Sequence, residues 1–449
     1  MTAVAVAGLG DLAGMRDPRG LRGDAPLLDA WLRATAAAAQ GAFTPMTIPG
    51  HKQCQELTGA AVAGDIPLYG GLAAIKHADV LVADAERRAA RLWGADWCRL
   101  SVAGSTHGNQ ALALAAGSPG DEVIISRTLH RSLMLGLVLA GLRPVWVRPE
   151  LDPASGLPLA VAVETVRAAH PRACAVFLGD PSYAGTTGDL AGQAEAAHEA
   201  GVPLIVDAAW GAHLGFHPDL PPHALAAGAD AMVTSAHKML PAYSQGALVL
   251  ARTDRLDAAR LDRAFAATHT TSPAGAILAS IDAARALLAR DGEQLCARLL
   301  AAVTAARDRL RAVPGLRVLD GQQVDPAKLV VLLAGRAPRT VLPPREAFFA
   351  PHETVPADLA DGRISAELIA PHPPGIPVLA PGELVTAEII SALRAVLEDG
   401  GRIAYAADPT LATLQVLTMN QHQVSPGGGR ASTGDQPGSR ADSRRAPGP

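Results

Sequence analysis

The chain has few cysteines, few aromatic residues and no long apolar run. Its 449 residues include four cysteines, which are too far apart to suggest a disulfide framework or a zinc site: Cys54, Cys98, Cys174 and Cys296. No stretch supplies the roughly 20 apolar residues that a membrane-spanning helix needs, and no basic leader precedes the mildly apolar start. These absences predict a cytoplasmic protein with no metal site and no membrane partner.

Charge is also sparse and nearly balanced. The chain has 39 Lys and Arg residues against 43 Asp and Glu residues, and the basic residues are scattered along the sequence. This pattern argues against a nucleic-acid partner, which would require a basic patch or stripe. With 49% hydrophobic and 18% charged residues the chain has the composition of a folded globule. Because only 3% of residues are aromatic, the core must be built from Leu, Val, Ile and Ala.

Short apolar runs alternate with helix-like segments between residues 85 and 255. We predict strands at six ranges: Glu122 to Ser126, Pro144 to Arg148, Ala173 to Leu178, Leu204 to Asp207, Met232 to Ser235 and Gly246 to Ala251. Strands that alternate with helices are typical of βαβ units. The fold class predicted is therefore α/β, with a mostly parallel sheet in a large domain.

The pattern changes after residue 260 to long helices rich in Ala, Leu and Arg. We predict helices at 274–290, 294–313 and 387–398, a strand at 328–333 and a closing segment at 402–405. This gives an N-terminal arm at 1–45 with a short helix at 26–32, a large domain at 46–260 and a smaller C-terminal α+β domain at 261–418. Residues 419–449 lack apolar periodicity and are predicted to form a disordered tail.

Two of the predicted strands lead to residues that suit one cofactor. Lys238 follows the strand that ends at Ser235, and Asp207 ends the strand before it. A partly desolvated lysine amine adds to an aldehyde, and a buried carboxylate keeps a pyridine nitrogen protonated. The pair predicts pyridoxal 5′-phosphate held by Lys238 as a Schiff base. Each residue alone has a plainer interpretation, as a solvated loop lysine or a helix-capping aspartate.

A third segment has the features of a phosphate site. Gly104, Ser105 and Thr106 stand between an apolar segment and the Ala/Leu-rich run 111–116. Small residues at a helix start let backbone N–H groups approach an anion, and hydroxyls donate further bonds. The alternative is an ordinary N-capped helix.

Histidines supply the remaining candidates. His130 falls between a predicted strand and a helix, where it either stacks on the cofactor ring or caps the helix. His237 directly precedes Lys238. His213 and His217 lack the neighbouring carboxylates or cysteines that a metal site requires.

The order of motifs resembles the Orn/Lys/Arg decarboxylases, in a short form, over roughly residues 45 to 390. The resemblance rests on these segments: Thr47 to Lys52 (Thr-Ile-Pro-Gly-His-Lys), Gly104 to Thr106, Ser126 to Ser132, Asp180 to Tyr183, Asp207, Ser235 to Lys238, Pro371 to Pro377 (Pro-His-Pro-Pro-Gly-Ile-Pro) and Pro381 to Glu383. The opening and closing motifs are the most specific.

The resemblance implies a pyridoxal-phosphate enzyme of the aspartate aminotransferase fold (fold type I). It would release carbon dioxide from arginine, lysine or ornithine and leave a di- or polyamine. Lys238 would form the Schiff base, Asp207 would pair with the pyridinium, and His130 would stack on the ring. The phosphate region would be held by Gly104, Ser105, Thr106, Ser235 and His237. Ala209 would pack under the ring, Trp210 would lie near the substrate carboxylate, and Glu383 would meet its distal cation. Lys238 or His237 would protonate the product.

Some segments depart from the family pattern. Gln53-Cys54-Gln55 replaces a glycine-rich continuation, residues 65–72 carry fewer carboxylates than expected, and His372 replaces a usual tyrosine. These departures leave the substrate open. The alternatives are other pyridoxal-phosphate chemistry (aminotransfer, aldol cleavage or elimination) and a non-catalytic regulatory homologue. The closing proline-rich motifs favour the decarboxylase, for which the resemblance implies a homodimer or tetramer.

Overall fold

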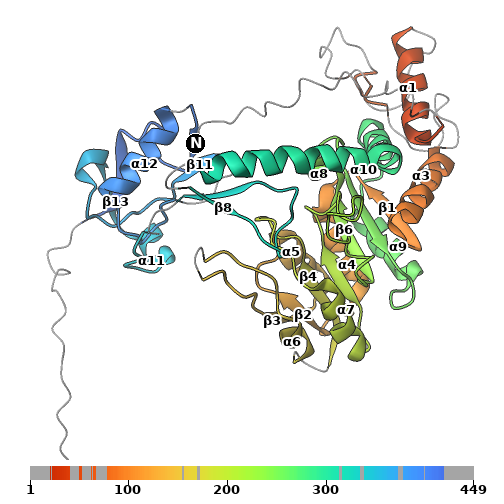
Figure 1. Cartoon of the computed structure of the whole chain (residues 1–449), viewed down its shortest axis with the longest axis horizontal. Coiled ribbons are helices and arrows are strands. Elements are labelled where there is room, and N and C mark those ends of the chain that lie inside the picture. Colours follow the sequence, from red (N-terminus) through yellow and green to blue (C-terminus); the bar gives the residue numbers. More distant parts are fainter. Residues whose placement is uncertain are drawn as a thin grey trace, which may run out of the picture. The chain divides into compact units, whose positions relative to one another are not determined.

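The computed structural model describes residues 21, 23–40, 50–52, 62, 64–66, 78–153, 156–168, 172–312, 316–333, 338–372, 378–398 and 400–418. They form two compact units, of which the first runs to residue 334 and the second begins at residue 335 (Figure 1). The predicted tail, 419–449, and the start of the predicted arm lie outside the described residues, as do the segments 53–55 and 67–72.

The first unit is built on a seven-stranded sheet in the order β1-β7-β6-β5-β4-β2-β3. The strands are β1 (Trp97–Ser101), β2 (Glu122–Ser126), β3 (Arg143–Val147), β4 (Ala173–Gly179), β5 (Leu204–Asp207), β6 (Ala231–Ser235) and β7 (Ala247–Ala251). Strands β2 to β6 pair in parallel, whereas β7 is antiparallel to both β6 and β1. All six predicted strands are confirmed to within one residue at each end.

Strand β1 was not predicted, because Arg99 interrupts its short apolar run. In the structure the Arg99 guanidinium pairs with Glu86 at 3.3 Å and with Asp262 at 2.5 Å. Asp262 also accepts a hydrogen bond from the Trp97 indole at 2.9 Å. The charge in the strand is thus neutralised by residues that are distant in the sequence.

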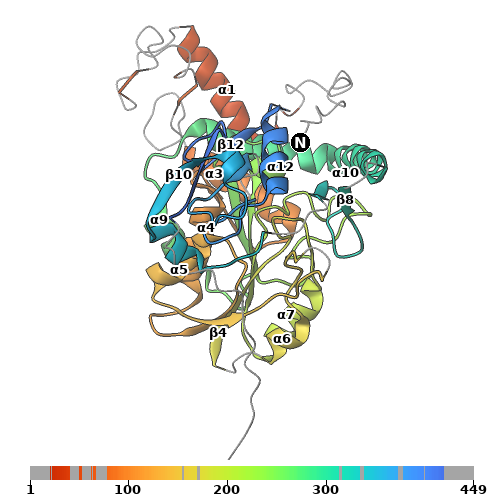
Figure 2. The same ribbon diagram turned by 90° about the vertical axis from the view of Figure 1, so that its left-hand side faces the viewer.

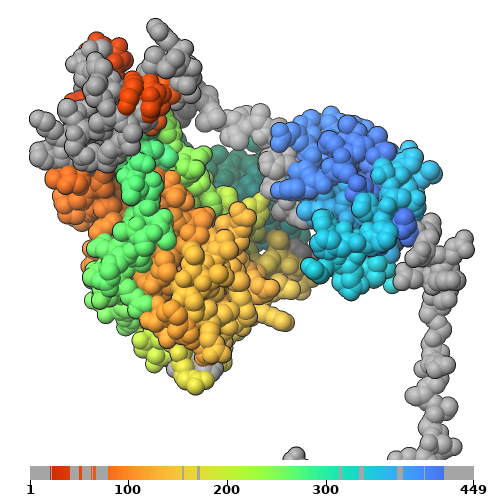
Figure 3. Space-filling view, turned by 180° about the vertical axis from the view of Figure 1, so that it is seen from behind, coloured from red at the N-terminus to blue at the C-terminus, as the bar shows by residue number. Residues whose placement is uncertain are grey.

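Alternate residues of the strands face two separate cores. Val123, Phe177 and Ile205 pack against α4 (Gly104–Ala116), α5 (Arg131–Ala140) and α9 (Ala258–Thr268). Ile124 and Leu178 belong to the other core, which contains residues of α1 (Pro26–Ala39), α3 (Ala78–Trp93), α6 (Val163–Arg167), α7 (Leu190–Glu199) and α10 (Gly275–Arg311). Figure 2 shows α4, α5 and α9 on one side of the sheet and α6 and α7 on the other. Figure 3 shows the green surface of α9 beside the orange surface around α4, with which it is in contact.

Helix α10 is one continuous helix, so the predicted break between residues 290 and 294 is wrong. Gly292 is buried there, and a Cβ at this position would lie 3.1 Å from Leu288 Cδ1 and 3.6 Å from Phe216 Cβ. The glycine therefore permits close packing and does not end the helix. Because α10 contributes Leu278 and Ile281 to the core of the first unit, residues 261–334 lie with the sheet and not with the smaller domain for which we predicted them.

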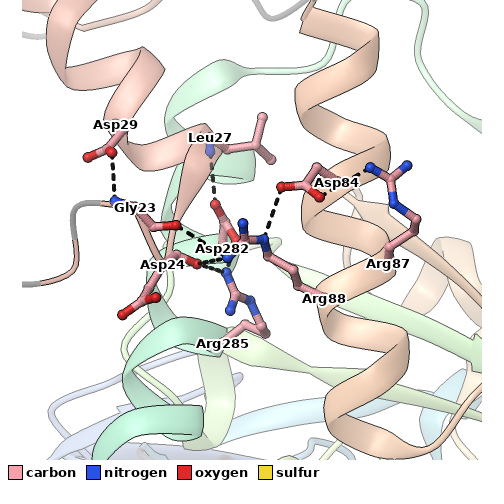
Figure 4. Close-up of polar contacts among 9 residues, drawn as sticks. All are labelled: Gly23, Asp24, Leu27, Asp29, Asp84, Arg87, Arg88, Asp282 and Arg285. Atoms are coloured by element: carbon pink, nitrogen blue, oxygen red, sulfur yellow. Dashed lines mark hydrogen bonds and ion pairs between the residues drawn. The ribbon is translucent and has the colours of Figure 1, made fainter.

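Polar contacts fasten α1 to α10 and α3 (Figure 4). The Leu27 N–H donates to Asp282 Oδ2 at 2.9 Å, and Asp282 Oδ1 accepts from Arg285 at 2.5 Å. On α3, Arg88 pairs with Asp84 at 2.9 Å and also donates to the carbonyl oxygens that precede α1. The helix predicted at 26–32 is confirmed and continues to Ala39.

The second unit is a small α+β structure. Strands β10 (His352–Pro356) and β13 (Thr413–Leu417) pair antiparallel, as do β11 (Ala370–His372) and β12 (Arg402–Ala404). Helix α12 (Ala387–Glu398), which has both bounds as predicted, buries Leu393 beside Leu379 and Val416, while α11 spans Pro344–Phe349. The antiparallel pair β8 (Leu316–Leu319) and β9 (Val330–Leu333) belongs to the first unit.

Candidate active site

A cavity of about 440 Å³ opens beside the carboxyl ends of β2, β4 and β5. Ligands of open α/β sheets bind at this edge, because the strands deliver side chains there from different parts of the chain. The residues that line the cavity include Ser105, His130, Asp180, Asp207, Trp210 and Lys238. Five of these six were predicted as site residues, so a single cavity collects side chains that are more than 130 positions apart in the sequence.

Asp207 and Lys238 form the charged centre of the cavity. Burial raises the pKa of Asp207, although hydrogen bonds from Asn109 and Ala209 and the charges of Lys238 and His130 act in the opposite direction. Burial likewise lowers the pKa of Lys238, against the attraction of Asp207. A lysine with a lowered pKa spends more of its time as the free amine, which is the nucleophilic form.

Asn109 links this centre to the neighbouring helix. Its Nδ2 donates to Asp207 Oδ2 at 2.7 Å and to Ser132 Oγ at 2.9 Å, and Ser132 Oγ lies 2.8 Å from His130 Nδ1. The amide thereby uses both of its N–H donors on buried oxygens. Sequence reasoning missed this role, although Asn109 follows Ser105 by four positions and so lies on the same face of α4.

His130 caps α5 and lines the cavity at the same time. Its Nδ1 accepts a hydrogen bond from the Ser132 N–H at 3.2 Å, which satisfies a backbone donor in the first turn. The capping alternative for His130 is thus observed, and stacking on a cofactor ring stays a prediction. The cap and the Ser132 hydroxyl together fix the orientation of the imidazole.

The start of α4 lacks an ordinary N-cap. Gly104, with a φ of +73°, begins the helix after Ala103, and Ala103 provides no side-chain cap. The alternative of an ordinary N-capped helix is therefore wrong. Ser105 lines the cavity, whereas Thr106 is exposed and lies outside the lining. The Gly104 N–H donates to the Gln245 carbonyl oxygen at 2.8 Å, so an anion at this helix start would accept from the N–H groups that follow Gly104.

Of the remaining predicted residues, Ala209 lines the cavity, whereas Ser235, His237 and Glu383 do not. Ser235 is fully buried with an Oγ that has no hydrogen-bond partner among the described residues. His237 is not part of the lining, and its Nδ1 bonds the Gly246 carbonyl oxygen at 3.0 Å. Glu383 belongs to the second unit, where its Oε2 accepts the Ala380 N–H at 2.8 Å.

Asp180 is a second buried acid in the cavity wall. Burial raises the pKa of Asp180 to about 7, the nearby Asp325 also raises it, and a hydrogen bond from the Gly188 N–H at 2.6 Å acts in the opposite direction. Its motif was noted in the sequence, but no role for Asp180 was predicted. A buried carboxyl group with this pKa can exist in either protonation state near neutral pH.

Trp210 brings two lysines together. Lys238 Nζ lies 4.5 Å and Lys328 Nζ 4.1 Å from the centroid of its ring, and Tyr183 packs edge-on at 5.7 Å. Lys328 was not predicted as a site residue. Lys328 does not line the cavity itself, and its position before β9 gives no local signal, because only the fold carries it to the Trp210 ring.

The described residues offer neither a metal-binding arrangement nor a membrane-spanning helix. Within the described ranges, no group of three or more His, Cys, Asp and Glu side chains is arranged to hold a metal ion. His213 instead pairs with the buried Asp325, at 3.2 Å between Nε2 and Oδ1. No helix among these residues combines the length and the apolarity needed to span a membrane.

Family comparisons agree with the motif order. Residues 61–340 match the model described as the Orn/Lys/Arg decarboxylase major domain, and residues 332–402 match that of the C-terminal domain. The chain belongs to the Orn/Lys/Arg decarboxylase family. The resemblance found in the motifs is therefore confirmed over most of the chain.

Individual members of this family are moderately similar in sequence. The arginine decarboxylase of Halalkalibacterium halodurans is 28% identical over 83% of this chain and 94% of the relative. That of Bacillus subtilis is 28% identical over 75% of this chain and 85% of the relative.

Solved structures share the fold of this family member. The constitutive lysine decarboxylase of E. coli superposes with a TM-score of 0.55 at 17% identity, covering 86% of this chain and 82% of that chain. Lysine decarboxylase A of Pseudomonas aeruginosa gives a TM-score of 0.57 at 18% identity, covering 88% and 80%. The predicted fold class, the α/β fold of pyridoxal-phosphate-dependent transferases with a smaller α+β domain, is thereby confirmed.

Proposed function

We propose that this protein is a pyridoxal-phosphate-dependent decarboxylase of a basic amino acid: arginine, lysine or ornithine. The observation that carries the proposal is the placement of Lys238 and Asp207 in one cavity at the strand ends, in a chain of this family. The products would be carbon dioxide and a di- or polyamine, which places the reaction in polyamine synthesis. Because relatives that align over most of the chain are named arginine decarboxylase, arginine is the first substrate to test.

The described residues fit pyridoxal phosphate. A buried carboxyl group faces a half-buried lysine, α4 begins without a side-chain cap, and Ser235 Oγ is buried without a partner among the described residues. When bound, this cofactor supplies an electron sink for the bond that breaks at Cα. Lys238 would hold its aldehyde, Asp207 its ring nitrogen and His130 its ring face, while Ser105 and Ser235 would hold its phosphate.

The roles of the protein side chains follow from their surroundings. Asp207 accepts from Asn109 and Ala209, and these bonds favour the charged form that a protonated ring nitrogen requires. Lys238 reaches the cavity as a partly desolvated amine, so we propose it as the group that returns a proton to Cα. His237 is the less favoured donor because its Nδ1 is bonded to the Gly246 carbonyl oxygen.

Two further assignments rest on the family resemblance. We propose that Trp210 lies near the substrate carboxylate, which agrees with its place in the cavity wall. Glu383 is proposed to bind the distal cation of the substrate. In that case Glu383→Gln should raise KM for arginine more than it lowers kcat.

Carbon dioxide release tests the function. Purified protein with added pyridoxal phosphate is incubated with arginine, lysine or ornithine, and the amine product is identified by mass spectrometry. We expect release from at least one of them and none with Lys238→Ala. Release of a keto acid or an aldehyde instead would move the assignment to aminotransfer or aldol chemistry. No turnover with intact cofactor binding would favour a regulatory homologue.

Assembly and location belong to the same proposal. Helix α5 exposes an apolar face whose members include Leu135 at 50%, Val138 at 71% and Leu139 at 57% exposure. A face of this kind supports a homodimer or tetramer, which light scattering would measure. Cys98, Cys174 and Cys296 are unpaired, which supports a reducing cytoplasm.

A further inference from the structure

Lys328 is a second lysine beside the proposed reaction centre. It precedes β9 in the first unit, and its Nζ lies 4.1 Å from the centroid of the Trp210 ring. Lys238 Nζ lies 4.5 Å from the same centroid. The two ammonium groups therefore contact one indole ring that lines the cavity.

Lys328 is not part of the cavity lining, but its nitrogen is bonded to residues that are. Nζ donates to the Tyr183 carbonyl oxygen at 2.9 Å and to the Ser182 carbonyl oxygen at 3.4 Å. Tyr183 and Ser182 both line the cavity. An ammonium group has three donors, so one N–H remains after these two bonds.

No carboxylate in the described part of the chain forms an ion pair with Lys328. The acid that acts on its charge is the buried Asp325, whose Oδ2 lies 3.1 Å from His213 Nε2. Burial lowers the pKa of Lys328 to about 8, Asp325 acts to raise it, and Lys238 lowers it further. At neutral pH most Lys328 side chains are still cationic, and this charge is balanced only partly.

The proposed reaction places an anion at this point. In that reaction the nitrogen of the amino-acid substrate would take the place of Lys238 Nζ, and the substrate carboxylate is joined to the carbon that carries this nitrogen. The carboxylate must therefore lie within two bonds of the position that the Lys238 nitrogen occupies. A half-buried cation that shares the Trp210 ring with Lys238, and that has one donor left, is suited to receive it.

We propose that Lys328 binds the α-carboxylate of the substrate and so helps to orient the bond that breaks. This inference rests on the proposed function. Because Lys328 contacts the carboxylate in the bound substrate, and that charge is lost as carbon dioxide leaves, its contribution is to binding more than to the chemical step.

The test compares each amino acid with the amine that differs from it by the carboxylate alone. Arginine and agmatine, and lysine and cadaverine, are titrated by calorimetry into Lys238→Ala protein loaded with pyridoxal phosphate, in which turnover is blocked. Lys328→Gln and Lys328→Arg are then added to this background. Glutamine keeps an N–H donor for the carbonyls of Ser182 and Tyr183 but removes the charge, while arginine keeps the charge.

We expect Lys328→Gln to weaken amino-acid binding by roughly 10- to 100-fold, the effect of one charge-assisted hydrogen bond, and to leave amine binding nearly unchanged. Lys328→Arg should recover most of the affinity. Equal losses for an amino acid and its amine would overturn the inference and identify Lys328 as a structural tie. Unchanged binding of both would also overturn it.

The two proposals fail in different ways. The decarboxylase assignment fails if protein with Lys238 and Lys328 intact releases no carbon dioxide, whereas the inference on Lys328 is decided by the ligand pairs. A third variant, Lys328→Met, checks the same prediction if glutamine at this position prevents folding. Thermal melting of each variant identifies any loss that comes from unfolding.

Discussion

Asn109 and Asp207 lie 98 positions apart in the chain, yet the Asn109 amide donates to Asp207 Oδ2 at 2.7 Å. The same amide donates to Ser132 Oγ at 2.9 Å, so it joins the end of β5 to the capped start of α5. The carboxyl group proposed to hold the cofactor nitrogen is therefore positioned by a side chain from the helix that begins at the proposed phosphate site.

Replacing Asn109 should weaken cofactor binding. Asn109→Leu removes the hydrogen bond that favours the charged form of Asp207, so the pKa of this buried carboxyl should rise further. We expect the dissociation constant of pyridoxal phosphate, measured by absorbance titration, to increase roughly tenfold or more. Ser132→Ala is the matched control, because it leaves the bond to Asp207 in place and should have a smaller effect. Equal affinities of Asn109→Leu and wild type would contradict this account.

Asp180 should make stability depend on pH. Its folded pKa of about 7 exceeds the ordinary value of 3.8, so the folded chain keeps a proton that the unfolded chain releases across this interval. The contribution of Asp180 to the free energy of unfolding therefore falls as the pH rises from about 4 to about 7. Asp180→Asn cannot ionise and keeps an acceptor for the Gly188 N–H.

We expect Asp180→Asn to melt about 3 to 6 °C higher than wild type at pH 8, with the difference shrinking toward pH 5. Differential scanning calorimetry at pH 5, 6, 7 and 8 measures this. A difference that stays constant over the whole range would show that Asp180 does not titrate there.

Gly108 sets the distance between α4 and the sheet. A Cβ at this position would lie 2.8 Å from Val233 Cγ1 and 2.8 Å from Val249 Cγ2. Gly108→Ala should destabilise the protein by about 1 to 3 kcal/mol, because the strain of overpacking outweighs the better helix propensity of alanine. Urea unfolding measures the change. Gly136→Ala on α5, where the nearest atom is Ala113 Cβ at 3.0 Å, should cost less; the reverse order would refute the packing argument.

The buried pair of Asp282 and Arg285 should control the attachment of α1. Asp282→Ala leaves the guanidinium, on a side chain that is 7% exposed, without its partner and removes the acceptor of the Leu27 N–H. We expect a loss of about 3 to 5 kcal/mol in urea unfolding and faster trypsin cleavage near α1. Asp29→Ala, which removes an exposed bond to the Gly23 N–H, is the control and should cost less than about 1 kcal/mol. Similar losses in both variants would argue against a special role for the pair.

Sequence patterns were sufficient to predict a strand where its own consecutive residues form a continuous apolar run. The apolar runs of β2, β4, β5 and β6 are continuous because both faces of these strands are buried, and their ends were predicted to within one residue. Strand β1 was missed because it contains Arg99, whose partner Asp262 lies 163 positions away. The break predicted near Gly292 failed because a glycine that ends a helix and one that permits close packing look the same in sequence.

The sequence by itself determined six of the seven strands of the large sheet, the family and the candidate residues Lys238 and Asp207, which lie at or shortly after a strand end. Only the tertiary structure decided the partners of these residues: Asn109 against Asp207, and Lys328 beside Lys238 across Trp210. The physical reason is that strand formation depends on the apolar pattern of a few consecutive residues. A hydrogen bond or a shared ring depends on where the fold brings segments that are far apart in sequence.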